Sequence, residues 1–184
     1  MAIEATICYI RGGGRVLLKT SVRGISKGYW NLPGGKIQRP ETPRQCVVRE
    51  VLEETGLRIK NVSKNGTMRL YDEPERLFYI IHVFSSGNYD GVLHSTEEGW
   101  VKWFDINAMP FEKMWGTARY VMPLIIQGKT INASFLIDKR RNVIGYRTGK
   151  GGQSAGLRWK PLPLEDLKYA TGDARPASGG RIQQ

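Results

Sequence analysis

A pair of glycines followed by a capped amphipathic helix is the feature of this chain that most constrains its fold. Thr42 is a good N-cap residue, and Pro43 suits the first helical position because the N–H it lacks would have no helical partner there. Gln45 stands three residues after Thr42, which is the spacing of a capping box. Gly56 can take the left-handed conformation that ends a helix. The sequence therefore predicts a helix over residues 43–55.

The side chains of this helix are expected to divide into two faces, at about 100° per residue. One face would pack into a core and holds Val47, Val48, Val51 and Leu52. The opposite face would carry three carboxylates: Glu50, Glu53 and Glu54. Carboxylates this close repel one another unless a cation lies among them, and hard oxygen ligands suit Mg²⁺ or Mn²⁺. A solvated acidic face is the alternative interpretation, since surface helices are commonly charged.

The loop before the helix favours the metal-binding interpretation. Gly34 and Gly35 allow the backbone to approach a ligand closely. Lys36 offers a compact positive charge for a phosphate group. A phosphorylated ligand bound beside a divalent cation would use both features.

The whole segment resembles the Nudix box, G-x5-E-x7-R-E-U-x-E-E-x-G-U, in which U is a bulky aliphatic residue. The matching positions are Gly35, Glu41, Arg49, Glu50, Val51, Glu53, Glu54, Gly56 and Leu57. The resemblance implies the Nudix fold, an α+β architecture with a mixed β-sheet sandwiched between helices (α/β/α). It also implies hydrolysis of a nucleoside diphosphate linked to another group, with Mg²⁺ as the usual cofactor and Mn²⁺ as a substitute.

The resemblance also assigns roles to individual residues. It implies metal ligation by Glu50, Glu53 and Glu54, with the Gly34 carbonyl and Glu98 as further ligands. The general base is one of Glu50, Glu53 and Glu98, and the sequence does not choose among them. Arg49, grouped with the catalytic residues, is expected to pair with Glu41 and to fix the loop against the helix.

Within the family, the chain is similar to MutT-type enzymes that hydrolyse oxidised purine nucleoside triphosphates such as 8-oxo-dGTP, over roughly residues 3 to 148. The similarity implies that Asn31 reads a purine edge and that Trp115 stacks on the base, although core packing is an alternative for Trp115. Where those relatives have two adjacent acidic residues, this chain has Thr117 and Ala118, which cannot make a charge-assisted contact with a base. Thr117 is nevertheless a candidate substrate-binding residue.

Three functions remain as hypotheses. The first is hydrolysis of an oxidised purine nucleoside triphosphate to a monophosphate and pyrophosphate. The second is a Nudix pyrophosphohydrolase of another substrate, such as ADP-ribose, a dinucleoside polyphosphate or an RNA 5′ end. The third is a nucleic-acid-binding protein that keeps the Nudix architecture, and the basic C-terminal tail is the feature that suggests it.

Runs of alternating or apolar residues predict short strands around two helices, the order of an α+β sandwich. The expected strands are Ala5–Ile10, Arg15–Thr20, Leu57–Val62, Thr67–Tyr71, Leu77–Phe84, Trp100–Phe104, Ile131–Ile137 and Val143–Arg147. A second helix is expected over Ala118–Gln127, and the polar stretch Ser85–Ser95 is expected to be a loop. These elements place a Nudix domain over residues 1–148.

Residues 149–184 are rich in Gly, Pro and Ser and read as a tail with little capacity to bury itself. Most of the net charge of +11 lies outside the box, from Lys139 onward, and because these charges are spread rather than stacked on one face, we expect a solubilising basic surface rather than a nucleic-acid site. Cys8 and Cys46 are expected to be buried free thiols. No signal peptide or membrane-spanning run is apparent, so we expect a cytoplasmic protein. The resemblance implies a nucleotide as its partner.

Overall fold

The computed structural model describes residues 2–148 together with residues 159 and 160. In chain order the elements are β1 (Ile3–Gly12), β2 (Arg15–Thr20), η1 (Gly24–Ser26), β3 (Trp30–Asn31), α1 (Pro43–Thr55), β4 (Leu57–Lys60), β5 (Ser63–Glu73), β6 (Arg76–Ser86), β7 (Asn88–Gly91), β8 (Val101–Asp105), η2 (Phe111–Lys113), α2 (Ala118–Ile126), β9 (Ile131–Ile137) and β10 (Val143–Thr148). Apart from residues 159 and 160, the expected tail of residues 149–184 lies outside the described residues.

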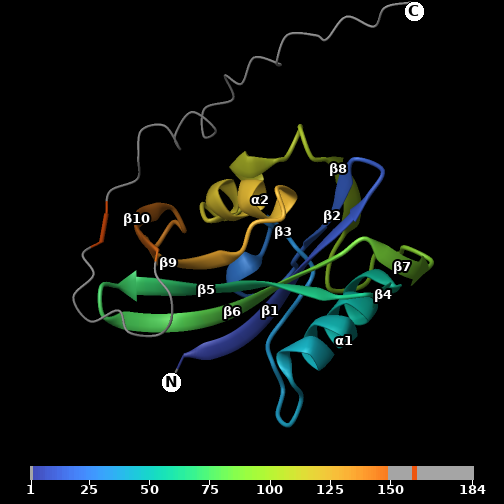
Figure 1. Cartoon of the computed structure of the whole chain (residues 1–184), viewed down its shortest axis with the longest axis horizontal. Coiled ribbons are helices and arrows are strands. Elements are labelled where there is room, and N and C mark those ends of the chain that lie inside the picture. Colours follow the sequence, from blue (N-terminus) through green and yellow to red (C-terminus); the bar gives the residue numbers. More distant parts are fainter. Residues whose placement is uncertain (1, 149–158, 161–184) are drawn as a thin grey trace, which may run out of the picture.

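The main sheet is mixed, in the order β10-β9-β5-β6-β1-β2-β3, with β8 paired to the other edge of β2. Strands β1 and β6 run parallel, as do β5 and β9, whereas β5 pairs with β6 in antiparallel register. The two helices lie on opposite sides of this sheet (Figure 1). The expected α+β architecture, a mixed sheet between helices, is therefore confirmed.

Alternating side chains of β1 and β2 divide the core between the two faces of the sheet. Cys8 and Leu17 belong to the cluster that packs against α1, together with Val47 and Val51. Their neighbours Tyr9 and Leu18 belong to the larger cluster on the α2 side. Both cysteines are buried free thiols, as expected. Among the residues that the structure describes, neither helix combines the length and the apolar composition needed to cross a bilayer.

The glycine loop is bound directly to the edge of β1. Strand β2 pairs with β1 only at the hairpin, where Arg11 faces Val16 and Gly12 faces Arg15. Further back along β1 the chain around Pro33 and Gly35 takes its place: Cys8 N–H donates to the Pro33 carbonyl and Thr6 N–H donates to the Gly35 carbonyl, both at 2.8 Å. The loop is thereby held between the sheet and α1.

Helix α1 begins and ends where the sequence predicts. The capping box of Thr42 and Gln45 is present, and Gly56 closes the helix in the left-handed region with φ 75°. The predicted division of its faces is wrong in part, because Val48 and Leu52 are 37% and 40% exposed. The face toward the sheet consists of residues three, four and seven apart, and it includes Glu54, which is only 4% exposed.

The stretch Ser85–Ser95, expected to be a loop, contains a strand. Strand β6 continues to Ser86, and β7 then pairs antiparallel with β4, with Ile59 opposite Tyr89. The residues of β7 are of types that favour turns, but pairing with β4 satisfies their backbone groups. The other predicted strands are present, and β5 and β6 are longer than predicted. The hairpin of β9 and β10 is confirmed.

Candidate active site at the glycine loop and helix α1

Arg49 gathers three carboxylates at the exposed side of α1. Its Nη1 lies 2.8 Å from Glu50 Oε1 and 2.9 Å from Glu53 Oε2. The expected pair with Glu41 is confirmed as a two-pronged contact, Nη2 to Oε1 at 2.7 Å and Nε to Oε2 at 3.0 Å. Hydrogen bonding from Arg49 lowers the pKa of Glu41 to about 2, and the same contacts raise the pKa of Arg49. Arg49 thus ties the loop to the helix.

Glu54 is buried between the sheet and the glycine loop. Its Oε1 contacts Lys19 Nζ, and its Oε2 accepts a hydrogen bond from the backbone N–H of Gly34 at 2.9 Å. Burial raises the pKa of Glu54 to about 7, while the charge of Lys19 and the Gly34 N–H partly oppose that effect. The prediction that Glu54 shares an exposed face with Glu50 and Glu53 is therefore wrong. Its carboxylate instead reaches the peptide of Gly34.

Lys19 is a site residue that the sequence interpretation missed. It is 8% exposed and lies in β2, one strand period beyond Leu17, whose side chain packs on the α1 side. Residues two apart in a strand share a face, so Lys19 also points toward α1. A lysine at an inward-facing position opposite a helix with several glutamates is the signal that would have identified it.

Glu50 lies directly against Gly35, so a side chain at this position would displace the Glu50 carboxylate. A Cβ atom at this position would lie 2.3 Å from the Glu50 carboxylate. Burial raises the pKa of Glu50, opposed by Arg49 and reinforced by the charge of Glu53. The backbone of the glycine loop is therefore in direct contact with a carboxylate of the acidic helix.

The donor set fits a divalent cation. The carboxylates of Glu41, Glu50, Glu53 and Glu54 are paired with only two cationic side chains, Arg49 and Lys19. When all four are ionised this group retains two negative charges, and every oxygen is a hard ligand. Among the described residues no three His, Cys, Asp or Glu side chains converge as ligands, and the carboxylate oxygens instead contact Arg49 and Lys19. A metal ion would take the place of these contacts.

Glu98 is not brought into this group. It is exposed in the connection before β8, where its carbonyl accepts from Val22 N–H at 3.0 Å and its own N–H donates to Thr96 Oγ1 at 3.2 Å. In the described residues it forms no ligand cluster with the glutamates of α1. Its role as a ligand or base remains a prediction.

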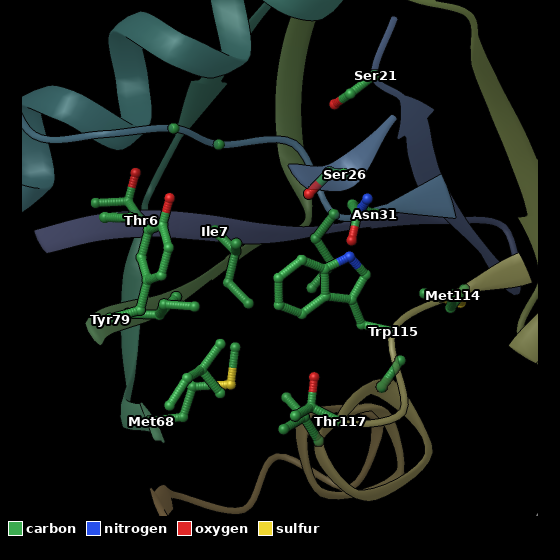
Figure 2. A pocket seen from close by; sticks show the side chains of 18 of the residues that line it. Thr6, Ile7, Ser21, Ser26, Asn31, Met68, Tyr79, Met114, Trp115 and Thr117 are labelled. Atoms are coloured by element: carbon green, nitrogen blue, oxygen red, sulfur yellow. The ribbon is translucent and has the colours of Figure 1, made fainter. Parts of the chain in front are cut away.

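A cavity of about 370 Å³ adjoins the carboxylates. Near the glycine loop it is lined by Lys19, Gly34, Gly35 and Lys36. Its lining also includes the three residues predicted to contact a base, Asn31, Trp115 and Thr117 (Figure 2), and we call the part around them the base end; Asn31 lies opposite Lys19 in the pairing of β2 with β3. The predicted phosphate-binding residues and the predicted base-binding residues therefore line the same cavity. Its walls include β2, the glycine loop, β3 and the start of α2.

The base end is neutral and partly prepared for hydrogen bonding. Asn31 Nδ2 donates to the Tyr29 carbonyl at 3.2 Å, which fixes the side-chain amide. Trp115 is 9% exposed, so it is both a core residue and a wall of the cavity. Thr117 is buried at the N-cap of α2 without capping that helix through its hydroxyl. No aspartate or glutamate is among the described residues that line the cavity.

Sequence interpretation also missed hydroxyl groups that line the cavity. They belong to Thr6, Ser21, Ser26 and Tyr79, and several appear in Figure 2. They are contributed by β1, by the segment around η1 and by β6. No local motif marks such residues, because they lie on separate strands; in the pairing of β1 with β6, Thr6 lies opposite His82 and Tyr79 opposite Ile3.

These features define a class: an α+β protein in which a carboxylate-bearing helix and a glycine loop adjoin a cavity whose charged lining residues, among those described, are all basic. Comparison with known proteins gives the family. The NUDIX domain matches residues 2–125, and the chain belongs to the Nudix hydrolase family, whose members generally use divalent metal ions. It is therefore an enzyme of that family.

Two curated relatives carry a more specific name. The oxidized purine nucleoside triphosphate hydrolase of Danio rerio is 37% identical over 124 residues, which cover 67% of this chain and 80% of the relative. The Mus musculus protein of the same name is 33% identical over 134 residues, 72% of this chain and 85% of that one. In fold, the crystal structure of the MutT protein from Bacillus halodurans is similar with a TM-score of 0.70 at 22% identity, covering 82% of this chain and 99% of that chain.

Proposed function

We propose that this enzyme hydrolyses a purine nucleoside triphosphate, with an oxidised purine such as 8-oxo-dGTP as its preferred substrate, to the monophosphate and pyrophosphate. The observation that carries the proposal is a cavity lined both by Lys19, Gly34 and Gly35, which contact the carboxylates of α1, and by Asn31 and Trp115. Its volume falls within the range of small-ligand sites, about 300–1,000 Å³. The names of the two animal relatives support the choice of an oxidised purine.

In this proposal the phosphates lie at the cationic end of the cavity. Lys36 and the backbone of Gly35 bind phosphate oxygens, and Lys19 supplies a further positive charge beside them. The ion that we propose is Mg²⁺, with Mn²⁺ as a substitute, held by Glu50, Glu53 and Glu54 with the Gly34 carbonyl and Glu98 as further ligands. When bound, it would neutralise phosphate oxygens and acidify a water molecule.

The remaining groups act on the proton and on the base. The general base is one of Glu50, Glu53 and Glu98, and Glu53 is the most exposed of the carboxylates held by Arg49. The indole of Trp115 stacks on the purine, and Asn31 and Thr117 offer neutral hydrogen bonds to its edge. The free buried thiols fit a reducing compartment such as the cytoplasm.

A steady-state comparison of substrates tests the proposal. With Mg²⁺ present, we expect kcat/KM for 8-oxo-dGTP to exceed that for dGTP, with one monophosphate and one pyrophosphate formed per turnover. The same panel should include ADP-ribose, a dinucleoside polyphosphate and a capped RNA. Equal efficiency on 8-oxo-dGTP and dGTP would reject the oxidised purine, and preference for another member of the panel would replace the substrate class.

A further inference from the structure

A guanidinium from the tip of the β9–β10 hairpin lies against two aromatic rings beside the cavity. Arg141 Cζ is 5.3 Å from the ring centroid of Trp115 and 4.9 Å from that of Tyr29. A cation within about 6 Å of an aromatic centroid is attracted to the ring. Trp115 lines the cavity, whereas Arg141 is not among the described residues that do. Arg141 therefore contacts the indole from outside the cavity.

This arrangement connects two of the three residues predicted to contact a base, Asn31 and Trp115. The carbonyl of Tyr29 accepts the hydrogen bond that fixes the side-chain amide of Asn31. On the other side, the N–H of Gly116 donates to the carbonyl of Arg141 at 3.1 Å. One residue thus holds the segment before Asn31 and the segment that carries Trp115.

The hairpin tip is built to keep Arg141 in place. Arg141 has φ 67°, a left-handed conformation that non-glycine residues rarely adopt and that persists only where the surroundings impose it. Its N–H donates to the Asp138 carbonyl at 2.9 Å, and Asp138 Oδ1 accepts the N–H groups of Arg140 and Asn142, each at 2.8 Å. A Cβ on Gly116 would lie 2.9 Å from the Arg141 carbonyl, so the tip and the Trp115 segment are in close contact.

We infer that Arg141 is a positioning residue for base recognition, which acts through Trp115 and Tyr29 rather than by touching the nucleotide. The inference rests on the proposed function, because it takes the cavity to hold a purine. Arg141 lies beyond residues 2–125, the part of the chain that the NUDIX domain matches. The planar guanidinium matters as well as its charge, since a guanidinium can stack on an aromatic face whereas the ammonium of lysine is a compact point charge.

The test compares a ligand that has a base with one that lacks it. Calorimetric affinities for 8-oxo-dGMP and for inorganic pyrophosphate, both with Mg²⁺, are measured on the full chain and on Arg141→Met, which keeps an apolar stem without the guanidinium. We expect Arg141→Met to weaken 8-oxo-dGMP binding about tenfold and to leave pyrophosphate affinity within about twofold. Arg141→Lys, which retains the charge, is expected to fall between Arg141→Met and the wild type.

Arg140→Met is the matched control, because Arg140 is the exposed neighbour in the same turn. This variant should bind both ligands like the wild type. Unchanged affinity of Arg141→Met for 8-oxo-dGMP, or an equal loss for both ligands, would overturn the inference. If Arg141→Met has a lowered melting temperature, Arg141→Lys decides, and it must lose affinity for the nucleotide alone. A wild-type protein that binds pyrophosphate but no purine nucleotide would instead overturn the proposed function, and the inference with it.

Discussion

The two ends of the cavity are built in opposite ways. At the α1 end, four carboxylates and two cationic side chains crowd around a glycine loop, and most of them come from one continuous segment. At the base end, neutral side chains come from β3 and from the start of α2, and Arg141 of the β9–β10 hairpin contacts Trp115 from outside the cavity. Charge concentrated at one end suits phosphate chemistry that many substrates share. Neutral groups from separate segments can vary and thereby set which base is accepted.

If the chemistry is confined to the α1 end, neutralising one exposed carboxylate should remove activity without unfolding the protein. The side chain of Glu53 is 56% exposed, so Glu53→Gln should fold normally. We expect kcat to fall about a thousandfold, the range seen when a general base or a comparable catalytic group is lost. Turnover of 8-oxo-dGTP with Mg²⁺ measures this loss.

Glu75→Gln is the control, because Glu75 is exposed in the turn between β5 and β6. The control should retain wild-type kcat. A folded Glu53→Gln enzyme with full activity would show that the Glu53 carboxylate takes no part in turnover.

The same end of the cavity should also be the most sensitive in stability. Lys19→Met leaves the buried Glu54 carboxylate without its cation, and breaking one partner of a buried pair costs about 3–5 kcal/mol. The free energy of unfolding in urea at pH 8 measures the loss. The double variant Lys19→Met with Glu54→Gln should recover most of it, because no uncompensated charge remains buried. Lys129→Met, at an exposed position after α2, should cost little.

The opposite result would be informative too. If Lys19→Met is as stable as the wild type, Glu54 must be neutral in the folded protein at that pH. The contact with Lys19 would then be a hydrogen bond rather than an ion pair.

The protonation of Glu54 gives a pH dependence with a definite sign. Burial raises the pKa of Glu54 in the folded protein from 4.5 to about 7. Between these two pH values Glu54 is therefore protonated in the folded protein and ionised in the unfolded chain. This contribution to stability is fully present below about pH 4.5 and is lost as the pH rises through 7. In metal-free protein we expect the free energy of unfolding to fall by about 2–3 kcal/mol across this window. Urea titrations between pH 4.5 and 8 on the wild type and on Glu54→Gln isolate the effect, which should be absent from the variant.

The sequence predicted the α1 end better than the base end for a physical reason. The capping box, the αL glycine and the Arg49–Glu41 pair depend on short separations along the chain, and all three are present. The buried position of Glu54 depends on Lys19, which lies 35 residues away. The spacing of the four apolar residues of α1 instead predicted that Glu54 lies on the face opposite the core. Strand β7 and the contact of Arg141 with Trp115 likewise depend on partners that no local pattern reveals.

The smallest effect is expected at the neutral end, where a single hydroxyl is exchanged for a methyl group. Thr117→Val conserves shape, and the Thr117 hydroxyl does not cap α2, so the free energy of unfolding should change by less than about 1 kcal/mol. If this hydroxyl contacts the base where the two purines differ, at the N7–H and C8 carbonyl of 8-oxoguanine, the ratio of kcat/KM for 8-oxo-dGTP to that for dGTP should change about two- to tenfold, the effect of one hydrogen bond. Thr130→Val, at an exposed position before β9, is the control. An unchanged ratio, with both substrates affected equally or not at all, would place base selection on Asn31 and Trp115 and leave Thr117 as part of the wall.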